Sequence, residues 1–132
     1  MSTTEKQRNK VLSLLDHPEE YPGLPIRRDT DRRLLIFRYP SFEPYFSWSL
    51  FYSNKTYWIR RVGWDPSKCF PSENAEPLTF GSEVVCPNEV AETLLSSLAT
   101  ISIRPLQQPK LIGMDGTICG IVVGNYWLSC AL

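Results

Sequence analysis

Residues 34–64 constrain the fold most, because their apolar side chains follow a two-residue period through three successive segments. Residues 34–39 are apolar at nearly every position, as in a strand that is covered on both faces. Residues 46–53 alternate aromatic or leucine side chains with serines, so we expect a buried aromatic face and an exposed serine face. A short polar turn, Ser53-Asn54-Lys55, then leads into residues 56–64, which have high β propensity. The pattern predicts antiparallel strands.

Two other segments follow the helical period. A capping-box spacing from Ser2 to Glu5 precedes an apolar face and predicts a helix over about residues 4–16. Pro87 suits a first helical position, and the apolar residues after it predict a second helix over about residues 87–99. Prolines and Gly23 make residues 17–26 an extended lead-in, which together with the first helix we expect to be mobile.

The remaining segments complete a single domain over residues 1–132. Residues 65–77 are predicted to be a surface loop, and Leu78-Thr79-Phe80 is strand-like but too short to predict a strand. The chain closes with a predicted three-strand meander, residues 111–114, 117–123 and 126–131. The predicted fold class is therefore α+β: an antiparallel sheet of five or more strands with an N-terminal helix and one central helix.

Charge and hydropathy exclude several classes of protein. The 14 basic and 14 acidic side chains cancel, although residues 1–70 carry 12 basic and 8 acidic groups while residues 71–132 carry 2 and 6. A domain that binds nucleic-acid phosphates is usually strongly basic, so we do not expect this neutral chain to bind nucleic acid. No apolar run approaches the length of a membrane span, so we expect no membrane association.

The cysteines and the N-terminus indicate a compartment. Cys69, Cys86, Cys119 and Cys130 lack zinc-ligand spacing, and the sequence holds one histidine, so we expect no metal and no cofactor. The polar N-terminus has no secretory signal, which predicts a cytoplasmic protein with reduced thiols.

Catalytic motifs are also missing from the sequence. His17 is the one imidazole that a serine or cysteine nucleophile could use, and it stands beside Pro18 at a predicted helix end, where a capping role is the better interpretation. The glycines have neither Walker nor dinucleotide spacing. We predict no catalytic residues.

Aromatic and arginine side chains cluster in residues 45–64, and this is the most informative feature. Whichever face of the third strand is buried must carry an arginine, because Arg60 and Arg61 lie on opposite faces. Tryptophan and arginine are enriched at the energetic centres of protein interfaces. The binding residues that we predict are Trp58, Arg60, Arg61 and Trp64.

The last 20 residues, including Asp115-Gly116-Thr117 and Gly124-Asn125-Tyr126-Trp127, resemble a C-terminal hairpin of small uncharacterised bacterial proteins, some of them immunity-like partners of toxins. The resemblance implies a non-enzymatic binding role in a bacterial cytoplasm and assigns no catalytic residue.

Three functions remain open at this point. The leading hypothesis is a non-enzymatic domain that engages another protein through exposed aromatic and arginine side chains of the second and third strands, and an immunity-type protein is one form of it. The second is a small-ligand-binding or hydrolytic enzyme, with a pocket between the sheet and the helix at 87–99 and with Asp65, Arg60 or Cys69 at its mouth. The third is a single-stranded nucleic-acid binder that stacks bases on the aromatic side chains.

Overall fold

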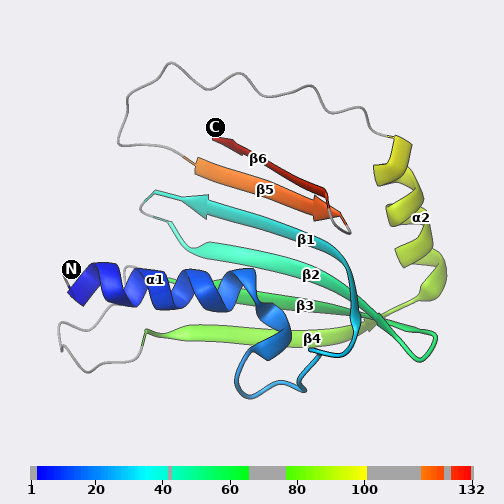
Figure 1. Ribbon diagram of the computed structural model, residues 1–132, viewed down its shortest axis with the longest axis horizontal. Helices are drawn as coiled ribbons and strands as arrows, with labels where there is room; N and C mark the ends of the chain where they lie inside the picture. Colours follow the sequence, from blue (N-terminus) through cyan, green and yellow to red (C-terminus); the bar gives the residue numbers. More distant parts are fainter. Residues whose placement is uncertain (1–2, 42, 66–76, 101–116, 124–125, 132) are drawn as a thin grey trace.

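The computed structural model describes residues 3–41, 43–65, 77–100, 117–123 and 126–131, and these form an α+β fold. Its core is one antiparallel sheet of six strands in the order β4-β3-β2-β1-β5-β6, which confirms the predicted fold class (Figure 1). The strands are β1 (Asp31–Pro40), β2 (Tyr45–Ser53), β3 (Thr56–Trp64), β4 (Thr79–Cys86), β5 (Thr117–Val123) and β6 (Tyr126–Ala131).

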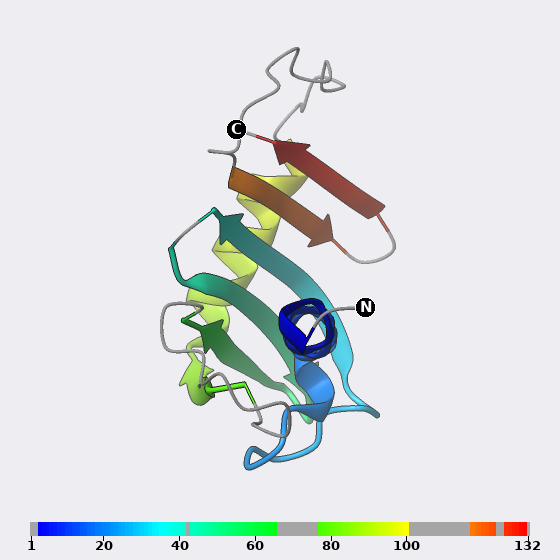
Figure 2. The same cartoon turned by 90° about the vertical axis from the view of Figure 1, so that its left-hand side faces the viewer.

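The two long helices lie on opposite faces of this sheet, as Figure 2 shows. Helix α1 (Thr3–Asp16) is followed by the short 3-10 helix η1 (Pro18–Glu20), and helix α2 (Asn88–Thr100) follows β4. We name the two sides of the sheet the α1 face and the α2 face. Each helix packs on its face through one apolar stripe, as expected for helices packed on a sheet.

The α1 face carries a core in which Val11 and Leu15 are fully buried against Tyr45, Val62 and Trp64. The serines of β2 point to this same face, and Ser47 and Ser49 are buried at 0% and 2% exposure. The prediction of an exposed serine face is therefore wrong. Small side chains on β2 leave room for the bulky groups of the neighbouring strands and for α1, so the serine face is the more deeply covered one.

The α2 face is covered at one end of the strands. Ala91 of α2 is buried in a cluster with Leu34, Leu50, Tyr57 and Cys86, and Leu95 and Leu98 pack against that cluster. In Figure 1, α2 lies across the end of the sheet at which β4 finishes and β3 begins. The opposite end of the α2 face, where β2 and β4 begin, bears no described helix.

The β2–β3 hairpin turns where it was predicted, at Asn54 and Lys55. Both residues have positive φ angles, of 50° and 62°, which is the conformation of a type I′ turn. Lys55 occupies the position that normally favours glycine. The registers Ser53↔Thr56 and Tyr52↔Tyr57 follow directly from this turn.

Several predicted boundaries need revision. Strand β4 runs from Thr79 to Cys86, whereas the sequence suggested only a short strand-like piece at residues 78–80. The predicted strand at 111–114 and the turns at 115–116 and 124–125 lie outside the described residues, as does most of the predicted loop 65–77. Strands β5 and β6 confirm the last hairpin.

Candidate functional site

Arg60 and Arg61 lie on opposite faces of β3, as the alternation requires. Arg60 opposes Ser49 of β2 and Glu83 of β4 on the α1 face, and Arg61 opposes Trp48 and Ser82 on the α2 face. The two faces therefore put these two adjacent arginines in entirely different surroundings.

Arg60 is fully buried and is held by one carboxylate and two backbone carbonyls. Its guanidinium donates from Nε to Glu83 Oε2 at 2.9 Å, and Nη2 forms an ion pair with the same oxygen at 2.7 Å. It also donates to the carbonyl of Pro18 at 2.8 Å and to the carbonyl of Pro25. The lead-in at residues 17–26 is thus bonded to the sheet through Arg60.

Glu83 accepts from a second arginine as well. Arg27 donates to Glu83 Oε1 at 2.6 Å and to Oε2 at 3.2 Å, and its guanidinium carbon lies 4.3 Å from the ring centre of Trp58. Burial alone would raise the pKa of the Glu83 carboxyl, but the hydrogen bonds and charges of Arg27 and Arg60 outweigh burial and lower that pKa. The buried carboxylate is therefore ionised at neutral pH.

The four predicted binding residues differ in burial and in the face of the sheet to which they point. Arg60 and Trp64 are buried, at 0% and 4% exposure, so the expectation that they are exposed is wrong. Trp58 is half-buried beneath Arg27 on the α1 face. Arg61 is exposed on the α2 face. The physical reason is that the α1 face, to which Trp58, Arg60 and Trp64 point, is the one covered by the N-terminal segment.

Arg61 lies among aromatic rings at the end of the α2 face that bears no described helix. Its guanidinium carbon is 4.4 Å from the ring centre of Phe46 and 6.0 Å from that of Phe80. Phe46 in turn contacts Phe80 and Trp48, with ring centres 5.8 and 5.6 Å apart. We call Phe46, Trp48, Arg61 and Phe80 the aromatic–arginine patch.

Gly63 allows the two phenylalanine rings of the patch to meet. It pairs with Phe46 on one side and with Phe80 on the other, and a methyl group at Gly63 would overlap both rings. The rings therefore close over a backbone position that has no side chain of its own. The sequence signal for Phe80 was weak, because one aromatic residue in a three-residue apolar segment does not define a strand.

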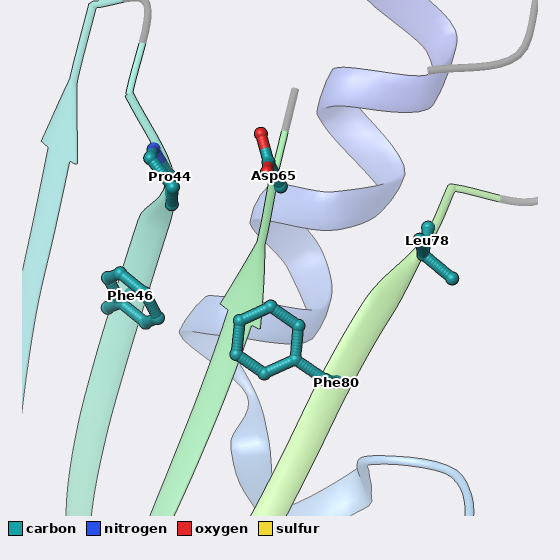
Figure 3. Close-up of a pocket in the computed structure, with 5 residues that line it drawn as sticks. All are labelled: Pro44, Phe46, Asp65, Leu78 and Phe80. Carbon is teal, nitrogen blue, oxygen red and sulfur yellow. The ribbon is translucent and has the colours of Figure 1, made fainter. Parts of the chain in front are cut away.

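A pocket of about 240 Å³ adjoins the patch at the start of β2 and β4. Phe46 and Phe80 line it together with Pro44, Leu78 and Asp65, and Figure 3 shows both rings on the side of the sheet away from α1. Asp65 is the one titratable group among the described residues that line it. The predicted enzyme pocket was placed between the sheet and α2, whereas this pocket lies at the other end of the strands.

The described residues offer little for acid–base or metal chemistry. No group of three or more histidine, cysteine or carboxylate side chains in the described ranges could hold a metal ion. His17 is exposed and lies 3.5 Å from Glu19, and Cys86 is buried. Cys69 lies outside the described residues.

Comparison of the chain with protein-family models, with curated proteins and with solved structures finds no match. No helix in the described part of the chain is long and apolar enough to cross a membrane.

Proposed function

We propose that this protein is a non-enzymatic binding domain whose aromatic–arginine patch engages another protein. The observation that supports this proposal is the exposed guanidinium of Arg61, which lies over Phe46 and beside Phe80 on a sheet surface that no described helix covers. Of the four predicted binding residues, the proposed site keeps Arg61 on the α2 face and leaves out Trp58, Arg60 and Trp64, which point to the α1 face.

The chemistry of the patch suits a protein partner. Stacking on an aromatic ring holds the guanidinium in a fixed plane, from which it can donate forked hydrogen bonds to a carboxylate. The rings of Phe46, Trp48 and Phe80 supply apolar area around that charge, as at the centre of protein interfaces. The adjoining pocket has a mainly apolar lining that can receive one anchoring side chain.

This binding role also fits the resemblance of the C-terminal hairpin to immunity-like proteins. We accordingly favour an immunity-type protein acting in a bacterial cytoplasm. The enzyme alternative has less support, because the described lining of the pocket at the patch offers a single carboxylate, whereas hydrolytic acid–base chemistry would need converging polar groups.

The test is quantitative affinity capture from an extract of the organism that encodes the chain. The wild-type protein is compared with Arg61→Glu and Trp48→Ala and with the charge-reversal control Arg28→Glu. Arg28 is also an exposed arginine, but it pairs with Glu20 at 2.8 Å near η1, away from the patch.

We expect one stoichiometric protein on the wild type and on Arg28→Glu, with recovery reduced at least about tenfold for both patch variants, as for residues at the centre of an interface. A partner retained equally by Arg61→Glu, or the recovery of a nucleic acid in its place, would contradict the proposal.

A further inference from the structure

Strand β4 is an edge of the sheet that the described strands form, and its own residues lack the features that normally block such edges. It pairs only with β3 among the described strands. Proteins usually protect edge strands with prolines, free charges or very short lengths. Strand β4 spans eight residues without proline, and its one charged side chain, Glu83, is already bonded to Arg27 and Arg60.

The side chains of β4 on the α2 face are exposed from Phe80 to Val84, whereas Cys86 at the end of the strand is buried beneath α2. Phe80 is 45% exposed, Val84 is 60% exposed, and Ser82 between them is also exposed. Helix α2 does not cover this edge, because it runs from the end of β4 across the sheet toward β5 (Figure 1). An added strand would therefore find backbone groups at the edge and a continuous row of contacts on the α2 face.

The register places Arg61 in line with this row. Trp48, Arg61 and Ser82 oppose one another across β2, β3 and β4. Neighbouring strands lie about 4.8 Å apart, so a residue opposite Ser82 on an added strand would be about 10 Å from β3. The long side chain of Arg61 can meet an acidic side chain there, since Ser82 is too small to separate them.

We propose, on the basis of the proposed function, that the partner binds by adding an extended strand to β4. Charge and shape specify that strand: an acidic residue lies opposite Ser82, and apolar residues two positions before and after it lie against Phe80 and Val84. The partner segment thus alternates in the pattern apolar, any, acidic, any, apolar.

The probe that tests this inference is the synthetic peptide acetyl-Ser-Thr-Val-Thr-Glu-Thr-Val-Thr-Ser-amide, which carries the pattern in both directions and so suits either strand orientation. Its binding to the full chain is followed by NMR titration. We expect shifts along β4 and around Arg61, and at least about tenfold weaker binding when lysine replaces the central glutamate, as expected for loss of a charge-assisted pair. Arg61→Glu should reverse this preference.

Two N-methylated peptides distinguish strand addition from simple surface binding. Alternate residues of a strand direct their N–H groups to opposite sides. In an added strand, the N–H groups that pair with β4 therefore belong to one set only, the Val and Glu residues or the Thr residues, and methylation of that set blocks pairing. We expect one methylated peptide to lose binding and the other to keep it. Val84→Lys should weaken binding, whereas Val90→Lys, on α2 at 58% exposure, should not.

The possible failures are distinguishable. Peptide binding that depends on Arg61 but survives both methylations overturns strand addition and leaves the proposed function standing. Absence of binding by the unmodified peptide also overturns strand addition. The capture experiment decides the proposed function separately, because it does not depend on how the partner's backbone is arranged.

Discussion

At the scale of single residues, Arg60 and Arg61 show how strand alternation assigns opposite roles to neighbouring side chains of the same type. Arg60 is buried with a carboxylate and two carbonyl groups, which satisfies the requirement that a buried charge be paired. Arg61 lies on aromatic rings at the surface. The sequence predicted that one arginine is buried but could not say which, because both faces of β3 carry aromatic residues.

Glu83→Gln tests the buried network at this scale. The substitution leaves two arginine guanidiniums facing a neutral amide, so we expect a loss of about 2–3 kcal/mol in the free energy of unfolding, measured by urea denaturation at neutral pH. Glu20→Gln is the matched control, because its pair with Arg28 is exposed and should contribute less than about 1 kcal/mol. Equal effects of the two substitutions would contradict the network.

The same network predicts how stability depends on pH. Folding lowers the pKa of Glu83 below its ordinary value of 4.5, so the unfolded chain binds the proton more readily than the folded one. The contribution of Glu83 is therefore complete above pH 4.5 and is lost as the pH falls through the lower pKa of the folded state. The stability difference between wild type and Glu83→Gln should shrink over that acidic interval. A difference that stays constant there would argue against an ionised Glu83.

At the scale of secondary-structure elements, the hairpins and helices follow from local sequence, while the burial of their faces does not. The predicted helices and the β2–β3 turn agree with the structure because caps, prolines and a short polar turn determine them locally. The serine face of β2 was wrongly expected to be exposed, since burial depends on α1 and on the segment that Arg60 holds. Most of strand β4 was not predicted, because its exposed valines and Gly81 do not alternate with polar residues.

Lys55→Gly tests the geometry of the β2–β3 hairpin. Lys55 has a φ of 62°, which glycine adopts without a steric penalty. We expect the substitution to raise the free energy of unfolding by about 0.5–1 kcal/mol, because the steric cost of about 1–2 kcal/mol that a left-handed residue carries exceeds the extra backbone entropy that glycine gives to the unfolded chain. Thermal unfolding at neutral pH measures the change, and destabilisation by Lys55→Gly would refute the type I′ assignment.

For the molecule as a whole, one face of the sheet is held by the N-terminal segment, and the other is covered only in part by the residues that the structure describes. The sequence predicted the fold class and favoured residues 45–64 as the place to seek a binding site, and this segment holds three of the four patch residues, Phe46, Trp48 and Arg61. The sequence did not predict that Phe80 belongs to the patch, because the contact between β3 and β4 joins positions far apart in the chain and depends on Gly63. Long-range pairing of this kind is visible only in the folded sheet.

The proposed function requires that a partner protein cover the aromatic–arginine patch. Hydrogen–deuterium exchange of the chain with and without its captured partner tests this claim, because it maps the covered backbone. We predict slowed exchange in peptides from β3 and β4, with α1 unchanged. Protection confined to α1 or to α2, with β3 and β4 exchanging as in the free chain, would contradict the claim.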